Sequence, residues 1–273
     1  MVILRAIGNF FVRIGRWIKN TAWIQPLLIV GGIFGLIFSI PYITKWVKSW
    51  VTETSAAETY YRSKEVSLEG AEDGKSDFDS LLKLLEAGGT GDEVKAARNK
   101  FGEKFFVSFV QEGCTDCEER YGGFKLLEND WGKDEFKDLK GKFKLHTVFI
   151  DSENDDGENL FKETYKRSTI TQVFEEATEV LQDENVHPYV ANCSADSTSY
   201  KSSLEKINDP ENFFSPTTIL VDFTTDADAP IWRSASGISE ILFSFEGESD
   251  ITYARTLANA WASEDIFSAS YKK

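Results

Sequence analysis

The spacing of apolar residues predicts strands that alternate with helices over most of the chain. An unbroken apolar and aromatic run at 105–110 is typical of a strand buried on both faces. A second run at 144–151 predicts a strand parallel to the first, joined to it by a right-handed crossover. A third strand is predicted at 218–223, and after a turn at 224–230 the residues 231–234 are predicted to form its antiparallel partner.

Helical periodicity fills the intervals between these strands. Predicted helices cover 76–87, 90–100, 118–129, a short segment at 131–139, most of 158–209, and 250–262. Ser76 or Asp77 is expected to cap the first of them, and Asp250 the last. Strands that alternate with helices in this way indicate an α/β fold.

The N-terminal region has a different pattern. Residues 1–19 carry four basic and no acidic side chains, with apolar residues near helical spacing, which predicts an amphipathic helix in a membrane interface. Residues 20–44 contain no charge and, as a helix, exceed the roughly 30 Å thickness of a bilayer core. We therefore predict one transmembrane helix with its interface over 20–50, a polar tether over 51–75, and a folded domain over 76–273.

The basic residues before the span predict a topology in the plasma membrane. They place the N-terminus in the cytoplasm and the acidic remainder in an extracellular or periplasmic compartment, where disulfides are permitted. A cleaved signal peptide is the alternative, but the cleavage-like residues 55–57 lie well beyond the apolar run. The small-residue pair Gly31 and Gly35 leaves open that residues 1–44 dock on an integral-membrane partner.

Charge and composition exclude several classes of function. The formal net charge of −15 argues against nucleic-acid binding, because such proteins present basic patches. The chain has 2 histidines, which disfavours most metalloenzyme schemes. The segment 152–163 partly matches a calcium-binding loop, but its first position is Ser152 rather than aspartate, and a solvated acidic turn is the preferred interpretation. We predict neither a metal nor a cofactor.

Two cysteines follow the first predicted strand. Cys114 and Cys117 come after a short turn and lead into a predicted helix, which is the context in which a Cys-x-x-Cys pair acts in redox chemistry. The unpaired N–H groups and partial positive charge of a helix start stabilise a thiolate on the first cysteine. A third cysteine, Cys193, is expected to be a buried free thiol, with pairing to a partner as the alternative. A zinc site that combines it with the other two has no support from the spacing.

A proline far along the chain completes a second motif. Pro216 stands directly before the strand at 218–223, where its missing N–H is tolerated, and an X-Pro bond there can be cis. Together with the Cys-x-x-Cys context, this arrangement resembles the thioredoxin superfamily over roughly 76–265. The resemblance implies that Cys114 is the attacking cysteine and Cys117 the resolving one. It also implies that the peptide Ser215–Pro216 is cis and faces them.

The resemblance carries further expectations. It implies that Ser215, Pro216 and Thr217 border the groove that binds an extended substrate, and that the helical stretch near 158–209 is an insertion on a thioredoxin-like domain. Gly113 occupies the position where the family usually has tryptophan. Acidic residues surround the pair and are expected to oppose thiolate formation; they are Glu112, Asp116, Glu118 and Glu119.

Two functions follow as hypotheses. The first is a membrane-anchored, extracytoplasmic thiol–disulfide oxidoreductase that acts on secreted or surface proteins through Cys114 and Cys117. The second is a non-catalytic, thioredoxin-fold accessory subunit of a membrane or secretion complex, in which the cysteine pair is structural. In both, the partners are proteins and the membrane.

Overall fold

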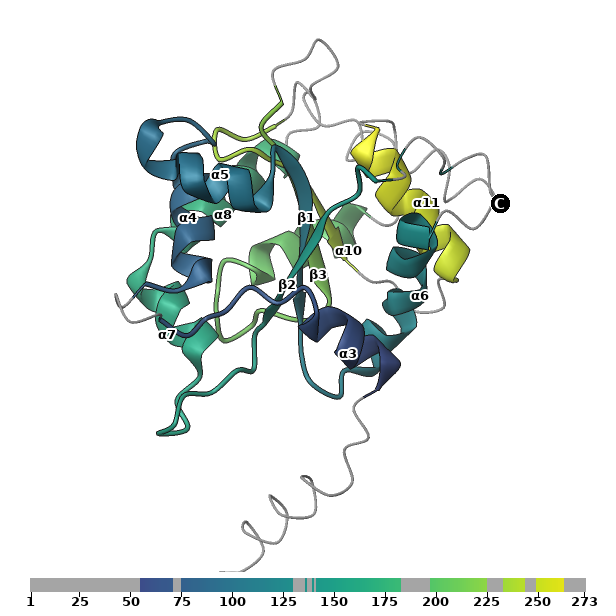
Figure 1. Ribbon diagram of the computed structural model, residues 1–273, viewed down its shortest axis with the longest axis horizontal. Helices are drawn as coiled ribbons and strands as arrows, with labels where there is room; N and C mark the ends of the chain where they lie inside the picture. Colours follow the sequence, from purple (N-terminus) through teal and green to yellow (C-terminus); the bar gives the residue numbers. More distant parts are fainter. Residues whose placement is uncertain are drawn as a thin grey trace, which may run out of the picture. The chain divides into compact units, whose positions relative to one another are not determined.

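A four-stranded mixed sheet forms the centre of the part of the chain that the computed structural model describes, which comprises residues 55–70, 75–129, 136, 139, 141–182, 197–224, 233–243 and 249–262. Its strands are β1 (Lys104–Val110), β2 (Leu145–Phe149), β3 (Thr217–Asp222) and β4 (Ile238–Phe243), and their order is β2–β1–β3–β4 (Figure 1). β1 and β2 are parallel, whereas β3 is antiparallel to both β1 and β4. The predicted α/β class and the parallel first pair are confirmed.

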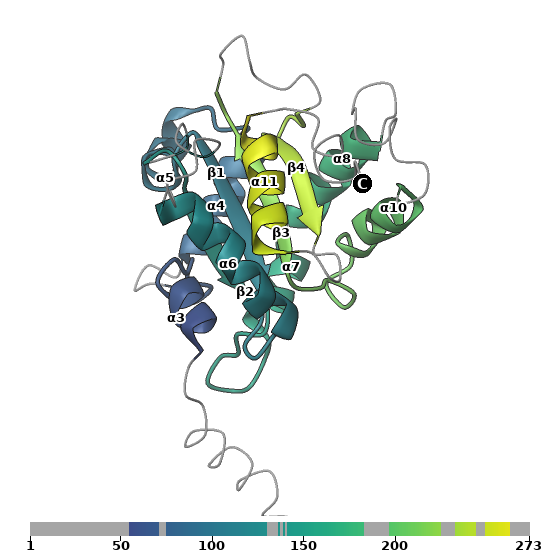
Figure 2. The same ribbon diagram turned by 90° about the vertical axis from the view of Figure 1, so that its right-hand side faces the viewer.

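Helices cover both faces of the sheet. They are α3 (Ala56–Arg62), α4 (Asp77–Glu86), the 3₁₀ turn η1 (Asp92–Val94), α5 (Lys95–Phe101), α6 (Thr115–Asn129), α7 (Leu160–Arg167), α8 (Ile170–Gln182), α10 (Ser197–Lys206) and α11 (Asp250–Trp261). α4, α5, α7 and α8 lie on one side of the sheet, and α6 and α11 pack together on the other (Figures 1 and 2). The predicted helical stretch 158–209 contains α7, α8 and α10.

The two faces of β1 supply the two halves of the core. Successive side chains of a strand point to opposite faces. Phe105, Val107 and Phe109 therefore belong to the apolar cluster beneath α4 and α8. Phe106 and Val110 belong to the cluster beneath α6 and α11. Burial on both faces explains why this strand reads as an unbroken apolar run rather than as an alternating one.

Helix caps agree with the sequence at one helix and differ at another. Ser76 caps α4, since its hydroxyl accepts from the N–H of Asp79 while the Asp79 carboxylate accepts from the N–H of Ser76. At α11 the cap is Ser249 rather than the predicted Asp250, which is already the first helical residue. The Ser249 hydroxyl accepts from the N–H of Thr252, and Asp250 instead places its charge in the first turn, where the helix dipole favours it.

The predicted partner of β3 is wrong. Of the predicted segment 231–234, residues 231 and 232 lie outside the described residues, and 233 and 234 belong to no strand. β3 has β1 on one side and Ile238–Phe243 on the other. Pairing begins where Gly237, at a φ of +83°, turns the chain and accepts from the N–H of Asp222. The strand was predicted at 231–234 because Trp232 and its neighbours suit a short strand. In the structure, the Arg233 guanidinium instead donates to the carbonyls of Asp222 and Thr224, at the end of β3.

Part of the predicted tether is folded. Residues 56–62 form α3, whose Tyr60 and Tyr61 are buried against the cluster beneath α6. The chain then runs beside β2, where Thr147 exchanges backbone hydrogen bonds with Lys64 and Val66. The segment lacks an apolar period of its own, because its burial depends on contacts with distant elements.

Several predictions lie outside the described residues. These are the amphipathic helix at 1–19, the membrane helix at 20–50, the tether ends at 51–54 and 71–74, most of the helix at 131–139, and Cys193. Within the described ranges, no helix combines the length and the apolar character that crossing a bilayer requires.

Candidate functional site

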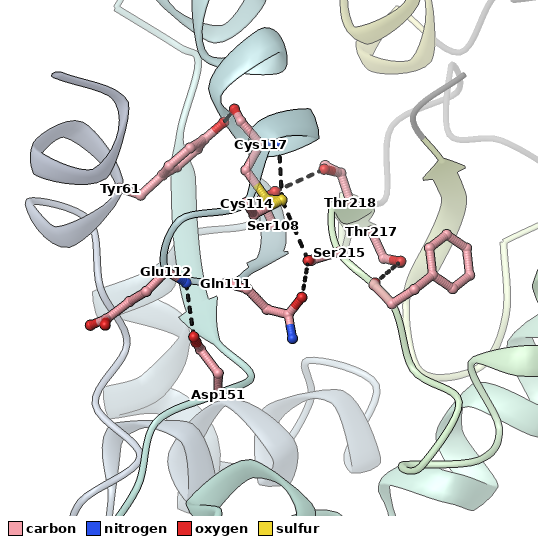
Figure 3. Close-up of a disulfide and its surroundings, with 11 residues drawn as sticks. Tyr61, Ser108, Gln111, Glu112, Cys114, Cys117, Asp151, Ser215, Thr217 and Thr218 are labelled. Carbon is pink, nitrogen blue, oxygen red and sulfur yellow. Dashed lines mark hydrogen bonds between the residues drawn. A yellow bond between two sulfur atoms is a disulfide. The ribbon is translucent and has the colours of Figure 1, made fainter. Parts of the chain in front are cut away.

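A disulfide joins Cys114 and Cys117 at the start of α6 (Figure 3). The two Cα atoms are 5.2 Å apart. Cys117 is 2% exposed, whereas Cys114 is only partly buried. An incoming thiol therefore reaches the sulfur of Cys114 rather than that of Cys117.

The loop before α6 is built for a tight change of direction. β1 ends at Val110, and Gly113 adopts a φ of +63°, in the left-handed region that side chains with a Cβ rarely adopt. This conformation accounts for a glycine at the position where the resemblance suggested tryptophan. The turn delivers Cys114 to the helix start, where the N–H of Cys117 donates to Cys114 Sγ at 3.1 Å.

The register of the sheet brings the second motif to the cysteines. Phe109 of β1 lies opposite Thr217 of β3, so the residues just before β3 lie beside those just after β1. The Ser215–Pro216 peptide is cis, as the resemblance implied. Ser215 Oγ lies 3.6 Å from Cys114 Sγ, although 101 residues separate them in sequence.

The three predicted substrate-binding residues do not lie alike. Ser215 is partly exposed beside Cys114, and Pro216 is buried next to it. Thr217 is fully buried, and its hydroxyl donates to the carbonyl of Phe214. Its side chain is thus used in the turn before β3, and only its backbone is part of the strand start.

Buried hydroxyls form a polar row on the sheet face that carries α6 and α11. Ser108 Oγ and Thr218 Oγ1 are 3.0 Å apart across β1 and β3, and Thr218 Oγ1 is 3.3 Å from Tyr253 Oη on α11. Ser108 and Thr218 are drawn beside the disulfide in Figure 3. Since hydroxyls both donate and accept, they satisfy one another inside the core.

α3 supports the redox loop from the other side. The Tyr61 hydroxyl donates to the carbonyl of Cys117 at 2.8 Å. Arg62 is paired with the exposed Glu112 and with Glu65, and its guanidinium lies 3.7 Å from the centre of the Phe149 ring. The segment expected to be a tether therefore touches both the loop and the helix that carry the disulfide.

The predicted acidic surroundings of the disulfide are present. Glu112, Asp116, Glu118 and Glu119 are all exposed. Burial raises the pKa of the Glu58 carboxyl, and the nearby charges of Glu112, Asp151 and Glu118 add to that rise. A site of this charge disfavours a further negative charge, which includes a thiolate on Cys114.

Asp151 is the least satisfied of these carboxylates. Its Oδ2 accepts from the N–H of Glu112 at 2.9 Å, whereas Oδ1 is buried without a hydrogen-bond partner in the described structure. Burial raises the pKa of Asp151, against the lowering effect of the Glu112 N–H. Asp151 thus ties the loop of the disulfide to the end of β2.

Four contributors to the site went unrecognised in the sequence. Gln111 accepts from the Ser215 hydroxyl, Tyr61 and Arg62 hold the loop from α3, and Asp151 binds its backbone. Asp151 is the last residue of one predicted strand and Gln111 directly follows another, so strand ends were a usable signal for these two. Nothing local marked Tyr61 or Arg62.

No metal site forms among the described residues, since no group of three or more histidine, cysteine, aspartate or glutamate side chains gathers there. The calcium-like stretch 152–163 forms a turn closed on Asn154, and Asn159 caps α7. This agrees with the preferred interpretation of a solvated turn that caps a helix.

Comparisons of the chain with protein-family models, with curated proteins and with solved structures found no match. The geometry of the Cys114–Cys117 site is therefore what bears on function.

Proposed function

We propose that this chain is a thioredoxin-fold thiol–disulfide oxidoreductase whose active pair is Cys114 and Cys117. The observation that carries the proposal is the asymmetry of the disulfide. It lies at the start of a helix, with Cys114 accessible beside Ser215 and Cys117 buried. A purely structural disulfide needs no such difference, whereas exchange needs one sulfur that a client reaches and one that is shielded.

The order of the elements supports the fold assignment. A strand leads through a Cys-x-x-Cys into α6, and β2 follows in parallel with β1. β3 begins directly after Pro216, and it is followed by the antiparallel strand β4 and then by α11. These are the features on which the resemblance to the thioredoxin superfamily rested. In this interpretation, α7, α8 and α10 belong to the inserted helical stretch.

The chemistry follows from the accessible sulfur. A client thiolate attacks Cys114 Sγ, the Cys114–Cys117 bond breaks, and Cys117 leaves as a thiolate while a mixed disulfide forms. A second client thiolate then attacks the client sulfur of that mixed disulfide and releases Cys114 as a thiolate. The client loses two electrons and the cysteine pair gains them; the reverse sequence reduces a client disulfide.

A trapping experiment tests the proposal. In the full chain with Cys193 replaced by alanine, Cys117→Ser leaves Cys114 without its resolving partner, so mixed disulfides with client proteins should accumulate. Cys114→Ser is the matched control, and it should trap little because Cys117 is buried. Equal or absent trapping in both variants would contradict an exchanging site.

The reduction potential separates catalysis from the accessory-subunit alternative. A value between roughly −120 and −270 mV is typical of exchanging pairs, whereas structural disulfides lie below about −300 mV. The acidic surroundings favour the more reducing part of the first range or the structural value. A structural value, with partner binding unchanged in Cys114→Ser, would establish the non-catalytic subunit.

The membrane anchor is part of the proposal. The uncharged segment within 20–50 would hold the domain on the extracytoplasmic side of the plasma membrane, where its clients would be secreted or surface proteins. Labelling of single introduced cysteines with an impermeant maleimide, in cells, tests this topology. If the maleimide labelled residues 1–19 but not the domain, the topology would be the opposite of the proposed one.

A further inference from the structure

The hydroxyl of Ser215 lies between two acceptors. Ser215 Oγ is 2.8 Å from Gln111 Oε1 and 3.6 Å from Cys114 Sγ (Figure 3). A serine hydroxyl carries one proton, so it donates to only one of the two at a time. In the disulfide state the sulfur is a weak acceptor, and the shorter contact to the amide oxygen takes the proton.

Reduction changes the balance between these acceptors. A thiolate on Cys114 carries a full charge, and hydrogen bonds to charged acceptors are about twice as strong as those between neutral groups. Among the described residues, the charged side chains around the disulfide are mostly acidic, so a neutral donor beside the sulfur has particular weight there.

We propose that Gln111 is a positioning residue of the redox site, because its side-chain oxygen competes with Cys114 Sγ for the single proton of Ser215. In the oxidised chain Gln111 holds the hydroxyl. In the reduced chain the hydroxyl turns to the thiolate and stabilises it, and Gln111 limits that stabilisation. The proposal rests on the proposed function, since it assigns these residues a role in setting the reactivity of Cys114.

The pH dependence of Cys114 alkylation tests the competition. The full reduced chain is treated with iodoacetamide across a pH series, and peptide mass spectrometry follows Cys114 separately from Cys117 and Cys193. Ser215→Ala should raise the measured pKa of Cys114 by about one pH unit, because a charge-assisted hydrogen bond is lost. Ser215→Thr keeps a hydroxyl and should restore the value of the parent chain.

Gln111→Ala gives the decisive sign. Removal of the competitor should lower the pKa of Cys114, and in the Ser215→Ala background the same change should have no effect. Gln172→Ala, an exposed glutamine on α8, is the matched control and should leave the titration unchanged.

Three outcomes would overturn the proposal. They are a raised pKa in Gln111→Ala, an unchanged one, or the same shift with and without the Ser215 hydroxyl. A raised value would mean that the amide N–H supports the serine as a relay. The trapping experiment is independent of this titration: clean shifts without trapped clients would contradict the proposed function alone, and trapping without shifts would contradict the role of Gln111 alone.

Discussion

The contact between Tyr61 and Cys117 predicts a specific loss of stability in Tyr61→Phe. The side chain is 2% exposed, and its hydroxyl donates to a carbonyl 56 residues away at 2.8 Å. Burial raises the pKa of Tyr61 well above its usual value, so the hydroxyl remains a donor at any working pH. Phenylalanine keeps the ring and its edge contact with Phe124, and removes only the hydrogen bond. A net protein hydrogen bond contributes about 1 kcal/mol to the free energy of unfolding.

The neighbouring residue offers a matched control. Tyr60 is also buried, but in the described structure its hydroxyl makes no hydrogen bond of ordinary geometry, although burial and the nearby Glu128 carboxylate raise its pKa. Tyr60→Phe removes a desolvated polar atom and no well-formed hydrogen bond, so it should be neutral or stabilising. The two variants make the same chemical change at adjacent positions of α3, and only the partner of the hydroxyl differs.

Urea unfolding of the oxidised chain measures both variants. Tyr61→Phe should lower the midpoint without changing the m-value, and in a thermal scan it should lower Tm by about 2–4 °C for a domain of this size. Equal losses in the two variants, or no loss in Tyr61→Phe, would show that the hydrogen bond from Tyr61 to the Cys117 carbonyl does not contribute to the free energy of unfolding.

Three further predictions concern other parts of the domain. Gly113→Ala should cost about 1 kcal/mol in urea unfolding, because a φ of +63° disfavours a Cβ that otherwise meets no neighbour. Lys104→Met should cost about 1–3 kcal/mol in the same assay, since it removes the closer of the two cations beside Asp222, which is 0% exposed; Lys104 Nζ lies 2.7 Å from Oδ2, and Arg233 remains at 4.0 Å from Oδ1. Asp151→Asn should change the pH dependence of stability. The raised pKa of Asp151 means that the parent chain loses stability as pH rises through that pKa, so the asparagine variant should gain on it from acidic to neutral pH; a constant difference across the series would contradict this.

The sheet shows which strands the pattern of apolar residues predicts correctly and which it does not. Strands β1, β2 and β3 lie close to their predicted positions because each is rich in β-branched, aromatic and other apolar residues, and this local composition needs no information from the rest of the chain. β4 was misplaced because the choice of partner depends on where Gly237 turns the chain, and the segment 231–234 follows the predicted turn more closely in sequence. The helices α4 and α11 were found from periodicity, although the cap of α11 was shifted by one residue.

The sequence alone determined the strands and helices whose spacing of apolar residues predicts their burial. It also identified the two cysteines and the proline, because their chemistry depends on residue type and on the adjacent sequence. Tertiary structure decided the rest of the site. The sheet register places Ser215 beside Cys114, and through it Gln111 shares a proton donor with the sulfur. α3 is buried only because α6 and β2 receive it. The physical reason is that hydrogen bonds between distant segments depend on ångström distances that no local pattern of apolar and polar residues encodes.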